Sequence, residues 1–265
     1  MVLVEDDCLF LPNLLAKLAQ QGLIDNIIII SSPFSWKRFL KNIRRFLEGF
    51  GYITAIKICI SILMAKILNI LAIYRFYSVK KVASVYDIPI ICVKKLHSQE
   101  VYKIIDQISP DIVFTQVTQL VKKTLLDKSV FWNKHCSLLP SYGGVYPVFW
   151  SMLNSECYLG VTIHKMDESF DTGTILSQAQ IPNVNLTFFE AYHQLYDLAG
   201  NLIIDLLISN KGKALGKDVK KSYFSFPNSQ AKKQFLKSNK MGFPFRLHKP
   251  VTPQKTLRVR KQITN

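Results

Sequence analysis

The sequence predicts an α/β fold, with a mostly parallel sheet flanked by helices, an inserted helical hairpin and a short basic carboxy-terminal segment. In the first half of the chain, short β-branched runs alternate with amphipathic stretches, which is typical of parallel strands joined by helices. Hydrophobic residues make up 49% of the 265 residues and charged residues 20%, which excludes a disordered chain. This length suggests one or two domains.

The elements of the first half follow from apolar periodicity. Strands are expected where apolar residues run together without interruption, over residues 2–4, 26–31, 88–93 and 111–115. Helices are expected where apolar residues recur every three or four positions, over residues 11–21, 79–86 and 100–108.

Residues 33–77 predict a helical hairpin inserted between two strands, basic in its first half and apolar in its second. Residues 50–74 are long enough to span a bilayer, yet Lys57 and Lys66 fall on opposite sides of such a helix. Three interpretations stay open: a transmembrane helix, a helix buried or packed on a partner, and a helix lying on a membrane surface. Basic residues precede the apolar part and favour the last: Lys37, Arg38, Lys41, Arg44 and Arg45.

In the second half, strands are expected over residues 130–136, 159–166 and 175–181, with a tight turn at residues 170–173. Helices are expected over residues 147–154 and 187–208. The second of these begins with a capping box, in which Thr187 is the N-cap and Glu190 lies three positions later.

The positive charge is concentrated after residue 210. The chain has 34 Lys+Arg and 18 Asp+Glu, a net charge of +16, and residues 211–265 hold 15 of the basic residues and one acidic residue, Asp218. We therefore place a boundary there, with a catalytic domain over residues 1–209 and a basic tail or small subdomain over residues 210–265. Such a segment suits a nucleic acid, an anionic membrane or a phosphorylated substrate, or is a solvated tail.

The five cysteines are odd in number and contain no CxxC pair, so neither a disulfide framework nor a metal site is expected. The start of the chain is acidic where a secretory signal would be basic. We expect a cytoplasmic protein, peripheral to the membrane if residues 50–74 lie on its surface.

Three polar residues are candidates for catalysis: Asn133, His135 and Asp171. Asn133 and His135 are two positions apart at a strand end, so their side chains share one face, at the edge where open α/β sheets bind ligands. An amide can donate to a developing oxyanion, an imidazole can relay a proton, and a carboxylate can orient that imidazole. These groups suit acyl transfer to an amine, although an N-x-H at a strand end is more often structural.

Other polar residues have weaker claims. His164 could replace His135 as a base, but a core or supporting role is favoured. Cys136 is adjacent to His135 and should therefore face the other side of the sheet. Gly143-Gly144 could cradle a phosphate, though a plain turn is favoured.

The stretch NKHCSLLPSYGG, followed by GVTIHKMDESFDTGTILSQ, resembles the folate-dependent formyltransferase family. This family includes methionyl-tRNA, glycinamide ribonucleotide and sugar N-formyltransferases, and its motif is N-x-H-x-S-x-L-P followed by D-x-G. The matching residues are Asn133, His135, Ser137, Leu139, Pro140, Asp171 and Gly173. The resemblance is strong over residues 110–207 and implies a Rossmann-like formyltransferase fold.

The resemblance also implies an activity and a set of roles. The formyl donor would be 10-formyltetrahydrofolate, a co-substrate, with no metal required. Asn133 would hold the formyl oxygen as it becomes an oxyanion, and His135 would assist proton removal or stabilise the tetrahedral intermediate. Asp171 would pair with His135 or bind the water that shuttles the proton. Donor binding would fall to Leu120, Val121, Ser137, Leu139, Pro140, Asp171 and Gly173.

The acceptor is expected to be a primary amine, with a nucleotide-linked amino sugar preferred. The alternatives are a methionyl-tRNA formyltransferase-like enzyme, for which a tRNA would be the partner, and a non-catalytic formyltransferase-like binding protein. Two features depart from the family. Glu5, Asp6 and Asp7 stand where the family has a glycine-containing loop for the acceptor's phosphate, and acidic residues repel a phosphate. The insert at 33–77 lies outside the common core, and the sequence leaves the oligomeric state open.

Overall fold

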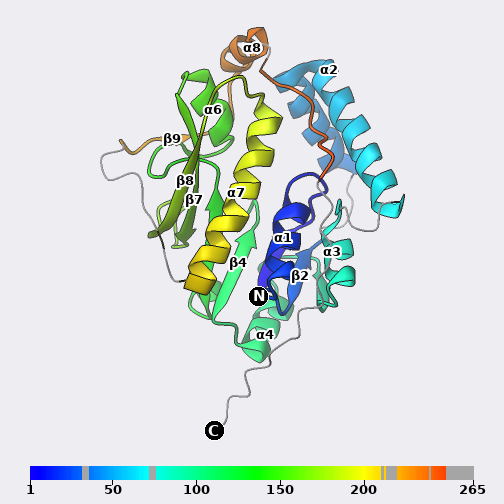
Figure 1. The fold of residues 1–265 in the computed structure, drawn as a ribbon, viewed down its shortest axis with the longest axis vertical. Helices are drawn as coiled ribbons and strands as arrows, with labels where there is room; N and C mark the ends of the chain where they lie inside the picture. The colour runs from blue at the N-terminus through cyan, green and yellow to red at the C-terminus, as the bar shows by residue number, and fades with distance from the viewer. Residues whose placement is uncertain (32–35, 72–75, 210–211, 213–219, 239, 249–265) are drawn as a thin grey trace.

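A seven-stranded sheet forms the centre of the molecule (Figure 1), with strand order β3-β2-β1-β4-β5-β7-β8. The computed structural model describes residues 1–31, 36–71, 76–209, 212, 220–238 and 240–248, and omits the side chains of residues 36–46 and 48–50. In chain order the strands are β1 (Val2–Glu5), β2 (Ile27–Ile30), β3 (Ile90–Val93), β4 (Ile112–Gln116), β5 (Val130–His135), β7 (Tyr158–Lys165) and β8 (Ile175–Pro182).

The first five strands of the sheet are parallel, and β7 and β8 are antiparallel additions at one edge. β1 pairs with β2 on one side and with β4 on the other. Successive strands are therefore added towards one edge of the sheet up to β3 and towards the opposite edge from β4 onwards. In open α/β sheets, ligands bind at the carboxyl edge beside such a reversal. The predicted fold class is confirmed.

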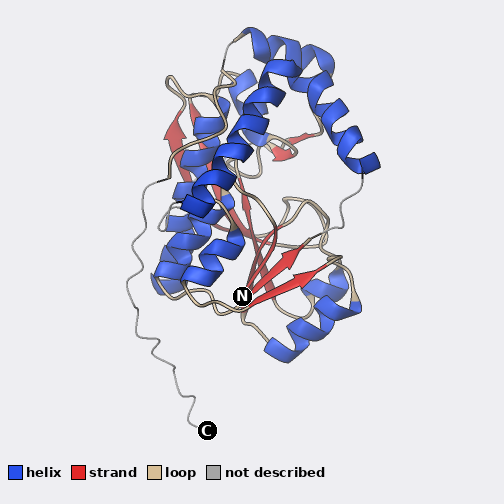
Figure 2. Cartoon of the chain, turned by 90° about the vertical axis from the view of Figure 1, so that its right-hand side faces the viewer, coloured by secondary structure: helices blue, strands red, loops and turns tan. Residues whose placement is uncertain are grey.

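Helices cover both faces of the parallel strands because those strands are apolar on both sides (Figures 1 and 2). In the run IIII, Ile27 and Ile29 pack into one buried cluster while Ile28 and Ile30 pack into another. On the first face lie α1 (Leu11–Gln20), α3 (Val79–Val85) and α7 (Phe188–Ser209). On the second lie α4 (Gln99–Ile108) and α5 (Lys123–Leu126).

The helix boundaries agree with local sequence signals. At the start of α7, Thr187 N donates to Glu190 Oε2 over 2.9 Å, and Glu190 N donates to Thr187 Oγ1 over 3.4 Å, so the predicted capping box is confirmed. Ser98 Oγ likewise accepts from Val101 N at the start of α4. The short helix α5 was not expected, because a run of four residues, KTLL, is too short to show helical periodicity.

The insert forms α2 (Trp36–Leu71), which is two helical segments joined at Gly51, where φ is 75° and ψ is 168°. This bend confirms the helical hairpin, although residues 32–35 and 72–75 at its ends lie outside the described residues. Among the described helices, the segment Gly51–Leu71 is long and apolar enough to cross a membrane by length and composition, which alone is weak evidence of a span. Only 17% of its apolar window is buried, so it is not a core helix.

The described part of the basic segment returns to the sheet domain. β9 (Tyr223–Phe224) pairs in parallel with β6 (Gly143–Gly144), and α8 (Ser229–Lys237) packs against α2 and α6 (Pro147–Leu153), as Figure 1 shows. Residues 220–226 therefore support the loop that follows β5. Residues 213–219 and 249–265, which carry much of the predicted basic tail, lie outside the described residues, as do the side chains of the basic residues at 37–45.

Candidate active site

Strand β5 places Asn133 and His135 on one face of the sheet, at its carboxyl end. The register across three strands pairs Thr115 of β4 with Asn133, and Asn133 with His164 of β7. Phe131 has the same parity as Asn133 and packs in the cluster beneath α4 and α5. Beyond that cluster, where helices no longer cover this face, loops enclose the polar row.

The three side chains in this row each bury a polar atom that has no partner among the described residues. These atoms are Oγ1 of Thr115, Oδ1 of Asn133 and Nε2 of His164. Buried polar atoms in folded proteins are nearly always hydrogen-bonded, and an unpaired one costs roughly 1–3 kcal/mol. Three in adjacent register positions therefore indicate a place where a polar ligand or water completes the hydrogen bonds. Sequence reasoning found Asn133 but missed Thr115, whose position only the sheet register reveals.

Asp171 lies against both histidines, although it is 38 positions from Asn133 along the chain. Its Oδ1 is 3.3 Å from Nδ1 of His135 and 3.9 Å from Nε2 of His164. Its Oδ2 accepts a hydrogen bond from the Gly144 backbone N–H at 2.7 Å. All three ionisable side chains are less than a tenth exposed. The structure thus brings the three predicted residues together and adds His164 to them.

Hydrogen bonding decides how His135 is used. Its Nε2 donates to the Tyr142 carbonyl at 2.8 Å, so Nδ1 is the nitrogen that meets Asp171. With Nε2 donating to this carbonyl, a proton gained on Nδ1 would be donated to Oδ1 of Asp171, 3.3 Å away. Burial lowers the pKa of His135 and the Asp171 carboxylate opposes that shift, as it does for the lowered pKa of His164. A buried pair of this kind can release and recover a proton.

The loop after β5 is held rigidly by a buried network on β7 and β8. Thr162 Oγ1 donates to the Ser137 carbonyl at 2.6 Å and accepts from Leu139 N at 3.0 Å. Gln178 Nε2 donates to the Leu139 carbonyl at 2.8 Å, and Ser137 Oγ to the Ser141 carbonyl at 2.7 Å. Ser137 and Leu139 are buried, whereas Pro140, which follows a cis peptide bond, is partly exposed. Ser137 and Leu139 therefore hold the conformation of the loop from its buried side.

The segment after residue 219 supports the same loop from outside. Gly143 N donates to the Ser222 carbonyl at 3.0 Å, and Val145 N donates to the Phe224 carbonyl at 2.9 Å. Between these two bonds lies Gly144, whose own N–H holds Asp171. A Cβ on Gly144 would overlap the Phe224 carbonyl oxygen, and its φ of 93° is one that L side chains rarely adopt. β9 thus positions the carboxylate of Asp171 through the backbone of β6.

The remaining residues expected to bind the donor lie in different surroundings. Leu120 follows β4 at the carboxyl edge and is 36% exposed, and its carbonyl accepts from Nε2 of His97 at 2.8 Å. Val121 is fully buried in the cluster under α4. Gly173 packs so closely that a Cβ there would overlap the Lys165 carbonyl oxygen. Leu120 is therefore accessible to a ligand, while Val121 and Gly173 pack against the protein itself.

The acidic loop after β1 satisfies backbone N–H groups just before α1. Oδ1 of Asp7 accepts from the backbone N–H groups of Leu9 and Phe10, the latter at 2.9 Å. Burial raises the pKa of Asp7. Oxygens of Glu5 accept from Thr118 Oγ1 at 2.9 and 3.0 Å. The N–H groups of Leu9 and Phe10, which directly precede α1 and could otherwise bind a phosphate, are thus occupied by a carboxylate of the chain itself.

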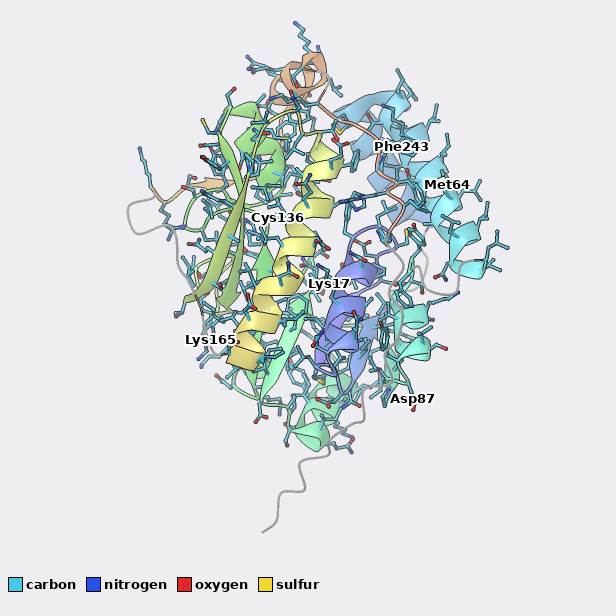
Figure 3. All side chains as sticks on the ribbon, in the orientation of Figure 1. Lys17, Met64, Asp87, Cys136, Lys165 and Phe243 are labelled. Atoms are coloured by element: carbon cyan, nitrogen blue, oxygen red, sulfur yellow. The ribbon has the colours of Figure 1, made fainter. Side chains whose placement is uncertain are left out.

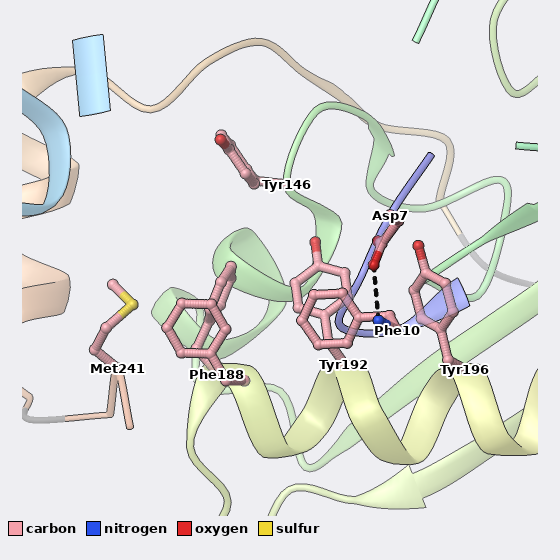
Figure 4. Close-up of a pocket in the computed structure, with 8 residues that line it drawn as sticks. Asp7, Phe10, Tyr146, Phe188, Tyr192, Tyr196 and Met241 are labelled. Carbon is pink, nitrogen blue, oxygen red and sulfur yellow. Dashed lines mark hydrogen bonds between the residues drawn. The ribbon is translucent and has the colours of Figure 1, made fainter. Parts of the chain in front are cut away.

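A cavity of about 290 Å3 lies on the opposite face of the sheet, beside α7 (Figure 4). Its lining is aromatic except for Asp7 and Met241. Lys134 is buried on this face, with Nζ 3.4 Å from the centroid of the Tyr196 ring and 3.3 Å from Cys136 Sγ. Cys136 therefore faces away from Asn133 and His135, as strand alternation predicted (Figure 3 labels it).

Comparison with protein families gives one match, to the formyl transferase family, over residues 64–207. The methionyl-tRNA formyltransferase of Finegoldia magna is 34% identical over 139 residues, which are 51% of this chain and 45% of that protein. That of Thermosipho melanesiensis is 38% identical over 131 residues, 49% of this chain and 43% of that protein. The chain thus spans less than half the length of these relatives.

Solved structures share the fold. An N-formyltransferase from Helicobacter canadensis, in complex with folinic acid and dTDP-3-aminofucose, has a TM-score of 0.53 and 21% identity, covering 85% of this chain and 70% of that chain. The phosphoribosylglycinamide formyltransferase of Bacillus halodurans has a TM-score of 0.54 and 18% identity, covering 83% of this chain and 99% of that one. At these sequence identities the structural similarity shows a shared fold and nothing about the substrate.

Proposed function

This chain belongs to the formyl transferase family, and from that premise we propose that it is an N-formyltransferase acting from 10-formyltetrahydrofolate on a primary amine. The observation that carries the proposal is the row of buried, unpartnered polar atoms on Thr115, Asn133 and His164. Asp171, which pairs with His135, also lies 3.9 Å from Nε2 of His164. The Asn133 amide nitrogen, bonded to the same carbon as the unpartnered Oδ1, and the Thr115 hydroxyl can donate to a carbonyl oxygen, while Oδ1 of Asn133 and the Asp171 carboxylate can accept from an attacking amine.

The reaction follows from these groups. The amine nitrogen attacks the formyl carbon, and the Asn133 amide donates to the oxygen as it becomes an oxyanion. The carbon–nitrogen bond to the donor then breaks. The attacking amine loses a proton to the pair of His135 and Asp171, and the pair passes a proton to the leaving nitrogen. Protons therefore balance, and no serine or cysteine nucleophile is required.

For the donor site we propose the carboxyl edge between β4 and β5. Leu120 would contact the pterin, and the loop that contains Asp171 and Gly173 would border it. Ser137 and Leu139 would shape the loop rather than touch the ring, because both are buried, and Pro140 would form its exposed edge. Support for a folate comes from the folinic acid in the Helicobacter canadensis neighbour.

For the acceptor we propose a nucleotide-linked amino sugar. Residues 220–226 brace the loop around Gly144 instead of standing apart as an RNA-binding unit. Because Asp7 occupies the N–H groups that precede α1, an acceptor phosphate would have to bind elsewhere. The dTDP-3-aminofucose in the same neighbour supports this class. A methionyl-tRNA acceptor is the second candidate, supported by relatives at 34–38% identity.

The test is a mass-spectrometric transfer assay. The purified protein is mixed with 10-formyltetrahydrofolate and, separately, with nucleotide-linked amino sugars, glycinamide ribonucleotide and methionyl-tRNA, and Asn133→Ala serves as the control. A formylated amino sugar that the control does not produce would support the proposal. If methionyl-tRNA were the only substrate formylated, it would be the acceptor in place of the amino sugar. A protein that neither consumes nor binds the donor would be a non-catalytic member of the family.

A further inference from the structure

The second segment of α2 presents a continuous apolar face to solvent. Its large side chains recur at alternating intervals of three and four, which places them on one side of the helix: Ile53, Ile56, Ile60, Leu63, Ile67 and Ile70. Each of them is at least 44% exposed. Figure 3 labels Met64 on this helix, which lies at the periphery of the molecule. The helix Gly51–Leu71 is about 30 Å long, and monomeric soluble proteins rarely expose apolar patches beyond a few hundred Å2.

The opposite side of this helix faces the protein, where Ile58 packs against the main buried cluster beside small side chains. Thr54, Ser61 and Ala65 are buried there. Lys57 Nζ donates to the Gly242 carbonyl at 3.2 Å, which attaches the helix to the chain beyond α8. A helix at a water-exposed surface normally buries its large apolar residues and exposes its polar ones. Here six large apolar side chains between Ile53 and Ile70 stay exposed, so the outward face is adapted to a surrounding other than water.

Charge indicates what that surrounding is. Residues 51–71 include two lysines and no acidic residue, and Lys66 is exposed. α8, which packs against α2, holds three lysines and no acidic residue, and Lys233 and Lys237 are exposed on it. Two copies of a chain of net charge +16 would bring like charges together at such an interface. An anionic lipid surface would instead attract the same cations.

We propose that the outward face of Gly51–Leu71 docks on an anionic lipid surface, with the helix lying in the plane of the headgroups and the lysines of α8 beside it. The helix does not need to leave the protein to do so, because its inward side keeps its contacts with the rest of the chain. Apolar area and anionic attraction together set the strength of such binding.

Flotation with lipid vesicles tests the proposal on the full chain. The vesicles are phosphatidylcholine alone, or phosphatidylcholine mixed with phosphatidylglycerol. One variant combines Ile56→Gln, Leu63→Gln and Ile70→Gln, side chains that are 58%, 58% and 80% exposed. The matched control combines Tyr158→Gln, Val184→Gln and Ile208→Gln, which are 53%, 67% and 60% exposed away from α2. Because all six side chains are exposed, folding should be retained, and circular dichroism checks this.

The wild type and the control should float with the mixed vesicles, and much less with phosphatidylcholine alone. The α2 variant should partition about 100-fold more weakly, since each outward side chain withdrawn from water contributes roughly fivefold or more. Lys233→Gln with Lys237→Gln should weaken binding on the order of 10-fold. Equal binding by the α2 variant, or equal binding to both vesicle types, would overturn the proposal. So would a dimer that the α2 variant abolishes while no vesicle is bound, because the occupant would then be a second copy.

Discussion

Replacing Gly144 by Ala should disconnect Asp171 from the segment that supports it. At a φ of 93° an Ala side chain is strained by roughly 1–2 kcal/mol. Its Cβ also overlaps the Phe224 carbonyl, so β6 and β9 must separate, and the flanking bonds from Gly143 and Val145 are lost at roughly 1 kcal/mol each. The displaced Gly144 N–H would then leave the Asp171 carboxylate without a charge-assisted bond worth roughly 1.5–3 kcal/mol.

Gly22→Ala is the matched control. Gly22 also has a positive φ, of 69°, but a Cβ there meets nothing within 4 Å. Urea unfolding should show a loss of roughly 1–2 kcal/mol for Gly22→Ala, and about 4 kcal/mol more for Gly144→Ala. Calorimetry with 5-formyltetrahydrofolate should show unchanged binding for Gly22→Ala and weakened binding for Gly144→Ala.

The reasoning would be refuted if the two variants unfolded within about 1 kcal/mol of each other and bound the folate equally well. That result would mean that the contact between β6 and β9 neither restrains Gly144 nor positions Asp171. Weakened folate binding without the extra loss of stability would refute only the free energies assigned to the three lost hydrogen bonds.

Three further predictions concern single side chains. Asn133→Ala should lower the rate of formyl transfer by about 10²-fold or more with little change in stability, because it removes the donor to the oxyanion; a rate within threefold of wild type, measured in single turnover, would exclude that role. Asp171→Asn should lower the rate by about 10²-fold, because a neutral amide stabilises a proton gained on Nδ1 of His135 less than a carboxylate does, and an unchanged pH–rate profile would contradict this. Burial lowers the pKa of His193, which donates from Nε2 to the Pro244 carbonyl, to about 4. Because the folded pKa lies below the usual 6.5, the contribution of neutral His193 to the free energy of unfolding is fully present above pH 6.5 and is lost as the pH falls towards 4. The loss should be about 2 kcal/mol between pH 7 and 5. In urea unfolding, the stability of His193→Gln should fall by that much less over the same pH range.

Several features of the fold and of the site could be predicted because their signals are local. The run at Ile27–Ile30 is apolar at every position, which requires a strand buried on both faces, and the capping box at Thr187 is set by residues three apart. Alternation along β5 was enough to place Asn133 and His135 on one face and Cys136 on the other. The proposed roles of Asn133, His135 and Asp171 remain predictions.

Other features depend on which strands and loops meet, which no local pattern contains. The register that puts Thr115 and His164 on either side of Asn133 is set by hydrogen bonding between strands far apart in the sequence. Residues 220–226 read as a basic tail, yet they pair with β6 and hold the loop that contacts Asp171.

The sequence by itself determined the α/β class, the order of the main elements and the shared face of Asn133 and His135, since each of these follows from spacing along a single strand or helix, while Asp171 became a candidate through the D-x-G motif. The tertiary structure decided which side of the apolar insert faces water. Residues 51–71 are apolar almost all round, and such a helix has no intrinsic inner face. Its orientation depends on distant groups such as the Gly242 carbonyl, and the result buries Thr54, Ser61 and Ala65 and exposes most of the large apolar side chains.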